Sequence, residues 1–314
     1  MDETPSVNID SGVGTARPPR VPGNAIALTV AVAAISTSGP LVVAITAPAL
    51  AIAFWRCALG AGATGLWVSL RQRAELRGLN RREQRVTVLA GLLLAVHFAT
   101  WIPSLRFTSV ASSTALVATQ PVWAALLARL RGKTVPGRVW LGIGVSLFGV
   151  LVLTGIDASI DRSVLFGDLL ALAGAVFAAA YVTAGESARA TVSTSVYTLT
   201  AYATSAIVLL VLCVVGNQAL VGFSVRDWVL IALLTAGAQL LGHTLINRTL
   251  RTTSATVTSL AILFEMPGSI IIAAIFVGQR PPASVIPAVA LLFVGLMIVI
   301  SSSGMRTPTE SPPI

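Results

Sequence analysis

The sequence predicts an all-α integral membrane protein of ten transmembrane helices, arranged as two inverted five-helix repeats. Three observations predict this fold class. The composition is 11% charged and 55% hydrophobic, with a mean hydropathy of +0.86, whereas soluble domains average about 25% charged residues. The apolar residues fall into long runs, and the two halves of the chain resemble each other. Most of the surface is therefore expected to face lipid.

Each predicted helix is an apolar run close to the length of about 20 residues that a bilayer requires. Several runs are bounded by Pro, Gly or Arg, as with Pro48 before the second run, and such residues mark helix ends. The first run is too long for a secretory signal, so we interpret it as a retained span. The ten runs lie at 25–46, 48–70, 86–104, 109–130, 137–155, 166–185, 195–215, 228–247, 253–277 and 283–303.

The charged residues alternate between the connections. Residues 71–85 carry six arginines, and the connection after the fourth run is also basic. Connections on the other side hold isolated arginines, such as Arg106 and Arg226, together with Asp157 and Asp161. This positive-inside pattern places both termini in the cytoplasm of a multi-pass inner-membrane protein. The net charge of +9 is thereby explained by anionic lipid headgroups, and we expect no nucleic-acid partner.

Four segments make up the predicted domain organisation. Residues 1–24 and 304–314 are polar and rich in Pro or Gly, so we expect disordered cytoplasmic tails. Residues 25–155 form the first repeat and residues 166–303 the second. Cys57 and Cys213 lie inside predicted spans and are interpreted as packing residues. No motif predicts a metal or another cofactor, and the sequence leaves the oligomeric state open.

The repeat is most evident at the two histidines of the chain, His97 and His243. They are 146 positions apart, and the same offset pairs Pro121 with Pro267. An odd number of spans per copy forces the second copy to insert upside down. Inverted repeats of this kind are typical of secondary transporters, whose sites lie near the midplane between the repeats.

Several segments resemble a known family. They are "APALAIAFWRCALGA" from Ala47, "LRFTSVASSTALVATQPVWAALLARL" from Leu105 and "GDLLALAGAVFAAAY" from Gly167. With "TSATVTSLAILFEMPGSIIIAAIFVGQRPP" from Thr253, they resemble the EamA-type ten-helix permeases of the drug/metabolite transporter superfamily. The resemblance implies transport of small metabolites such as amino acids, more often export than uptake, without ATP hydrolysis. The chain departs from the family pattern where Gly132-Lys133 and Gly278-Gln279 replace Gly-Glu.

Two pairs of polar residues are the first candidates for a substrate site. Ionisable residues at bilayer depth are costly and usually functional. His97 and Trp101 share one helix face, as do His243 and Asn247, and the inverted symmetry brings the two faces to equivalent positions. They either line a cavity or make structural hydrogen bonds across helices. For Trp101 the alternative is an aromatic belt at the membrane surface.

Proton coupling is predicted at Glu265 or His97. Glu265 precedes Pro267 by two residues, and proline loosens the preceding helical turn. Pro121 and Pro267 are therefore the predicted bending points. The alternative for Glu265 is a buried ion pair with Arg56. Gln120, beside Pro121, is a predicted substrate contact that cannot titrate.

Arg56 and Tyr181 complete the predicted substrate-binding residues. Arg56 attracts a substrate carboxylate, extends to the outer headgroups or forms a structural pair. Tyr181 is either an interface anchor or a cavity hydroxyl.

The function predicted from these features is secondary transport of a small metabolite by alternating access, with export and proton coupling as the working hypothesis. One alternative is an intramembrane enzyme using His and Glu as acid and base on a lipid, although no nucleophile–base cluster is evident. The other is a non-transporting receptor, which would not need inverted repeats.

Overall fold

The computed structural model describes residues 21–108, 110–154, 162–277 and 285–303. Helices and their connections make up this part of the chain, which contains no β-strand. The predicted tails lie outside the described residues, except that residues 21–24 form the first turn of α1. The Gly278-Gln279 connection also lies outside them.

The helices follow the predicted runs closely. In chain order they are α1 (Val21–Ile35), α2 (Ser38–Ala44), α3 (Ala49–Arg71), α4 (Arg73–Gly78), α5 (Arg81–Ser104), α6 (Val110–Val117), α7 (Gln120–Leu130), α8 (Gly137–Thr154), α9 (Arg162–Ala188), α10 (Thr194–Val215), α11 (Val225–Leu234), the π-helix η1 (Thr235–His243), α12 (Thr244–Thr249), α13 (Ala255–Ile262), α14 (Glu265–Val277) and α15 (Val285–Ser303).

Among the described residues, seven helical segments are long and apolar enough to cross a membrane. Three of them join consecutive helices: Asn24–Ala44 spans α1 and α2, Val225–Thr249 spans α11, η1 and α12, and Ala255–Ile272 spans α13 and the first part of α14. Two shorter apolar helices, Gly137–Val152 and Ile286–Val299, accompany them. The chain is thus a multi-pass helical membrane protein.

Two interruptions directly precede the prolines that the sequence marks as bending points. α6 ends before α7 starts at Gln120-Pro121, and α13 ends before α14, which contains Pro267. In the second break the amides of Leu263 and Phe264 bond to carbonyls three residues back. Proline lacks an amide hydrogen and clashes with the preceding turn, so a regular helix cannot continue through it. Whether these breaks move during function stays a prediction.

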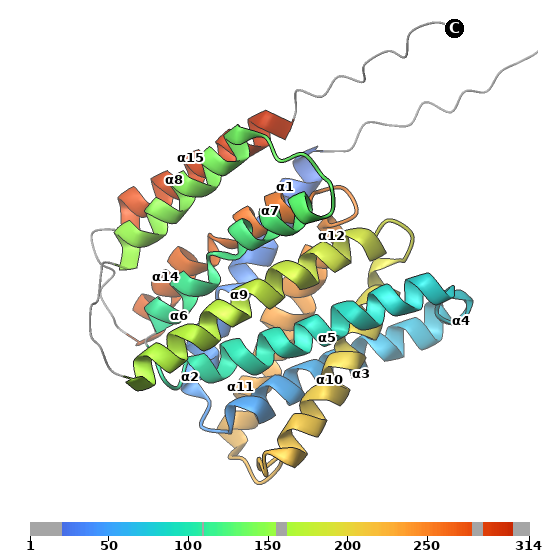
Figure 1. Ribbon diagram of the computed structural model, residues 1–314. Coiled ribbons are helices and arrows are strands. Elements are labelled where there is room, and N and C mark those ends of the chain that lie inside the picture. Colours follow the sequence, from blue (N-terminus) through green and yellow to red (C-terminus); the bar gives the residue numbers. More distant parts are fainter. Residues whose placement is uncertain (1–20, 109, 155–161, 278–284, 304–314) are drawn as a thin grey trace, which may run out of the picture.

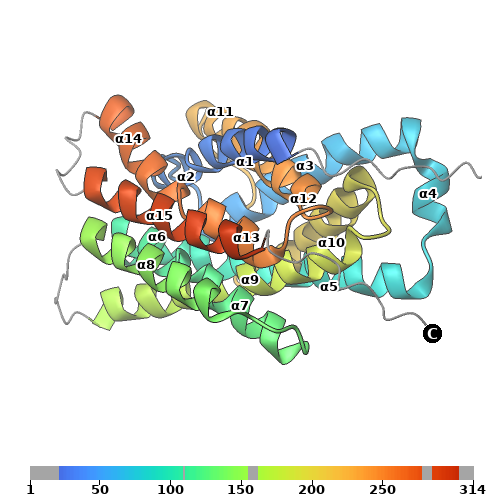
Figure 2. The ribbon, with the colours of Figure 1, turned by 90° about the horizontal axis from the view of Figure 1, so that it is seen from above.

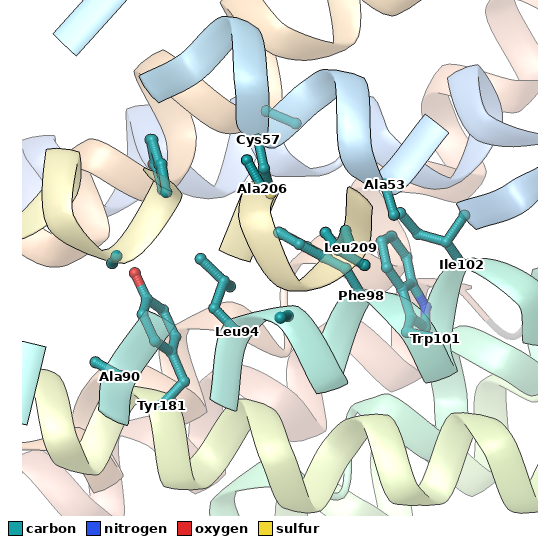
Figure 3. Packing of buried hydrophobic residues seen from close by; sticks show 14 of the residues in the cluster. Ala53, Cys57, Ala90, Leu94, Phe98, Trp101, Ile102, Tyr181, Ala206 and Leu209 are labelled. Carbon is teal, nitrogen blue, oxygen red and sulfur yellow. The ribbon is translucent and has the colours of Figure 1, made fainter. Parts of the chain in front are cut away.

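The bundle is built around two tightly packed sets of helices. α3, α5, α9 and α10 run side by side, and α8 pairs with α15 at one edge (Figure 1). The main apolar core joins α3, α5, α9 and α10 through residues such as Cys57, Leu94, Phe98 and Leu209 (Figure 3). Cys57 and Cys213 are both free and buried.

One end of the bundle gathers the basic connections. The helix α4, the connection 131–136 and the connection 250–254 all lie toward the same end in both views, opposite the start of α9 (Figures 1 and 2). We call this the basic end. Arg129, Arg131 and Lys133 are exposed there, as is Arg251.

Candidate functional site

A central cavity lies where the two halves of the chain meet. The space not occupied by atoms amounts to about 760 Å³, open mouth included. Its walls come from α1, α2, α5, α6 and α7 of the first half and from α9, η1, α12, α13 and α14 of the second. Six predicted site residues line it: His97, Trp101, Gln120, Tyr181, His243 and Glu265. Arg56 and Asn247 lie behind the wall.

His97 and Trp101 form one aromatic wall of the cavity. The His97 Nδ1 atom lies 2.9 Å from the Gly174 carbonyl oxygen, so Nδ1 donates and the neutral ring keeps Nε2 as an acceptor. The imidazole stacks on the Trp101 indole with 5.9 Å between centroids and 3° between planes. Trp101 is 4% exposed, which favours the cavity interpretation over an aromatic belt. Its Nε1 donor is buried without a hydrogen-bond partner.

Arg56 is fully buried beside this wall. Its Nε donates to Gln239 Oε1 at 2.9 Å and Nη1 donates to Ser38 Oγ at 3.3 Å. The guanidinium lies 4.1 Å above the Phe98 ring centroid. The expectation that Arg56 extends to the headgroups is therefore wrong, because polar and aromatic partners inside the bundle offset the cost of burying the charge.

Gln239 is the residue that sequence reasoning missed here. It lies in the π-helix η1 and is fully buried. A lone glutamine in the apolar segment "TAGAQLLGH" was the available signal. The matching stretch of α5, 146 positions earlier, is ordinary α-helix. π-Turns often occur at functional sites. This one places Gln239 within hydrogen-bond distance of Arg56, and it places His243 at the cavity wall.

Glu265 begins α14 and has no direct charged partner. The ion pair with Arg56 considered above is not formed: within the described residues, the ion pair found joins Lys133 to Glu186. Arg56 still interacts with Glu265 electrostatically, and also with His97 and His243. The cavity therefore places one carboxyl group and two imidazoles in the field of one buried guanidinium.

Asn247 supports the site from behind. Its Oδ1 accepts a hydrogen bond from Tyr181 at 2.7 Å, and its backbone carbonyl accepts one from Arg189 at 3.0 Å. Arg189 lies just outside the spanning segments, where burial lowers the pKa of its guanidinium. This chain of contacts links the cavity hydroxyl to the basic end.

Ser259 is a further cavity residue that was not predicted. Its hydroxyl accepts a hydrogen bond of 2.9 Å from Gln120 Nε2, so the two broken helices meet there. Its repeat partner is Ser113, and that match was a usable signal. No group of three His, Cys, Asp or Glu side chains that could hold a metal occurs among the residues placed by the structure.

One comparison with known proteins identifies a family. The sequence model of the EamA-like transporter family matches residues 23–155 and again residues 165–301. A solved structure titled only "Crystal structure of protein" superposes with a TM-score of 0.74, over 91% of this chain and 99% of that one. Its 17% identity makes it evidence for the fold alone. No curated protein matches the sequence significantly.

Proposed function

The chain belongs to the EamA-like transporter family, and from that membership we propose that it is a secondary transporter of a small metabolite. In this proposal the central cavity opens alternately to each side of the membrane, and the substrate is exported. The substrate is a small polar compound such as an amino acid. The chain has no catalytic role in this proposal.

The observation that carries the proposal is the position of the cavity. Residues from both matched halves of the chain line it, including the paired histidines. In transporters with inverted repeats, substrates bind at this interface, near discontinuous helices. The broken helix α6–α7 contributes Gln120 to the cavity, and the broken helix α13–α14 contributes Ser259 and Glu265.

We propose ten spans with both termini in the cytoplasm. The seven long segments and two shorter apolar helices give nine crossings, and the broken helix α6–α7 supplies the tenth. The basic end would then face the cytoplasm, as the positive-inside rule requires. The membrane concerned would be the inner, or plasma, membrane.

Proton coupling at Glu265 is supported by its surroundings. The carboxyl lines the cavity beside a helix break, and no ion pair with another described residue holds it. A carboxyl group in this setting can exchange a proton when the cavity opens to one side. His97 is the second candidate, because its Nε2 remains available as an acceptor.

Solute flux in proteoliposomes containing only the purified protein tests the proposal. A panel of amino acids and related metabolites is first screened by thermal shift, since a ligand that binds the native state stabilises it. Flux of a hit should respond to an imposed pH gradient, and Glu265→Gln should abolish that response. Solute exchange measured in the absence of a pH gradient should persist in this variant. A flux indifferent to the gradient in the parent protein would remove the coupling claim.

The same preparation separates the alternatives. A receptor would bind a hit without moving it, and a lipid-modifying enzyme would change the lipid composition of the vesicles. His97→Asn, which keeps a polar group, should weaken substrate affinity about tenfold if the lost interaction is worth about 1.4 kcal/mol. Unchanged affinity and flux would remove His97 from the site.

A further inference from the structure

A second cavity lies at the basic end, in line with the central one. Its unoccupied space is about 870 Å³, open solvent included. Ala124 and Ala128 of α7, Thr183 and Glu186 of α9, and the first turn of α13 line it. Lys133 stands at its edge, in the connection between α7 and α8.

The two cavities use the same three helices. On α7 the central cavity is lined by Gln120 and the second cavity by Ala124, which is about one helical turn, or 5.4 Å, further along. On α9 the neighbouring residues Val182 and Thr183 line the central and the second cavity respectively. The wall between the cavities is therefore thin, and the apolar side chain of Leu260 is buried in this region.

The end of α7 is fastened to the last turns of α9 over the second cavity. Lys133 Nζ forms an ion pair of 2.6 Å with Glu186 Oε1. Arg131 Nη2 donates to Ser187 Oγ at 2.5 Å, and Nη1 donates to the Thr183 carbonyl at 3.3 Å. We call this group of contacts the latch.

The second cavity contains a polar group that the protein leaves unpaired. The Thr183 hydroxyl is buried, lines the cavity and has no hydrogen-bond partner. Buried polar groups are rarely left without a partner. Because the hydroxyl oxygen is shielded from water in this structure, water or a solute can reach it only when α7 and α9 separate.

Resting on the transport function above, we propose that the second cavity is the inner vestibule of the transport path and that the latch is its gate. While Lys133 and Glu186 are paired, the end of α7 stays against α9 and the vestibule is separated from the central cavity. When the pair breaks, α7 moves away from α9 and the two cavities join.

The repeat makes this gate one-sided. The position that matches Glu186 in the first copy is Pro40, and the residue that matches Lys133 in the second copy is Gln279. Neither side chain can form an ion pair, so the repeat does not reproduce the Lys133–Glu186 pair at the matching positions. The latch therefore favours the state that is closed at the basic end.

The test measures access to the central cavity without requiring a transported solute. A single cysteine is placed by Ala178→Cys, at a residue that lines the central cavity, in a protein whose Cys57 and Cys213 are replaced by alanine. The purified protein in nanodiscs is labelled with a charged thiol reagent, and the rate is followed by mass spectrometry. Glu186→Gln and Lys133→Gln should each label up to about fivefold faster, the range expected for a partly exposed ion pair.

Two further variants make the result specific. The charge swap Lys133→Glu with Glu186→Lys should return the labelling rate toward that of the parent. Arg129→Gln removes a positive charge from the same segment but not from the latch, and it should label like the parent. Gel filtration confirms that each variant is folded.

The gate is overturned if Glu186→Gln and Lys133→Gln label no faster than Arg129→Gln, or if the charge swap does not slow labelling again. Flux is measured separately. If no solute is moved but the latch variants still label faster, the proposed transport function is wrong. The latch would still control how far α7 opens away from α9.

Discussion

Arg56 shows how single residues hold the site together. Its guanidinium is fully buried and relies on Gln239, Ser38 and the Phe98 ring, while its Nη2 has no hydrogen-bond partner. A buried charge is tolerated when it is hydrogen-bonded. The same arrangement sets the electrostatic field around Glu265 and the two histidines.

Gln239→Leu should therefore destabilise the protein. The substitution preserves bulk but leaves Arg56 Nε without an acceptor, which costs about 1–3 kcal/mol or more for a charged donor. The thermal midpoint in detergent should fall, whereas Gln218→Leu, at a residue whose side-chain amide bonds only to a nearby backbone carbonyl, should barely change it. Equal midpoints for the two variants would show that Gln239 does not support Arg56.

At the scale of elements, close helix packing depends on particular glycines. α8 and α15 approach so closely that a Cβ on Gly142 would lie 2.6 Å from the Gly295 carbonyl oxygen and 2.6 Å from Val299 Cγ2. Two residues along the same helix, a Cβ on Gly144 would meet no atom within 4 Å. Small residues at such crossings let helix backbones approach in a membrane.

The pair Gly142→Ala and Gly144→Ala tests this packing within one helix. Gly142→Ala should destabilise the protein by about 1–3 kcal/mol through overpacking. Gly144→Ala should be neutral or stabilise it by up to about 1 kcal/mol through helix propensity. The measurement is the thermal midpoint in one detergent. If both alanines have the same effect, the α8–α15 contact is looser than described.

At the scale of the whole molecule, the two halves share one pattern and differ in chemistry. The repeat pairs His97 with His243, but it pairs Trp101 with Asn247 and Arg56 with Tyr202. In the structure both residues donate hydrogen bonds to Gln239. Arg56 donates to the Gln239 side chain, and Tyr202 donates to the Gln239 backbone carbonyl. A repeated scaffold thereby surrounds a cavity whose two sides differ in chemistry.

The whole-molecule prediction concerns orientation. Tags at the two termini should both be protected from protease in right-side-out vesicles and both be cleaved in inverted ones, since the basic connections favour the cytoplasm. A reporter inserted after Gln218, in the connection between α10 and α11, should show the opposite pattern. Termini on different sides would mean an odd number of spans.

The sequence by itself determined the apolar helical runs, the repeat and six of the polar or aromatic residues that line the cavity. Apolar runs of spanning length specify membrane helices because the backbone must satisfy its hydrogen bonds internally in lipid. A matching offset specifies which residues occupy equivalent places. The offset paired His97 with His243, and Trp101, Gln120, Tyr181 and Glu265 were predicted as polar or aromatic residues within the spans. The structure brings all six to one cavity.

The tertiary structure alone decided which polar residues face the cavity and which support it. Arg56 is placed behind the wall by Gln239, and Asn247 by Tyr181. These partners are 183 and 66 positions away in the chain, so no local pattern can reveal them. The Lys133–Glu186 latch is of the same kind. Periodicity reports on the face of one helix, whereas the partner of a buried polar group depends on how separate helices pack.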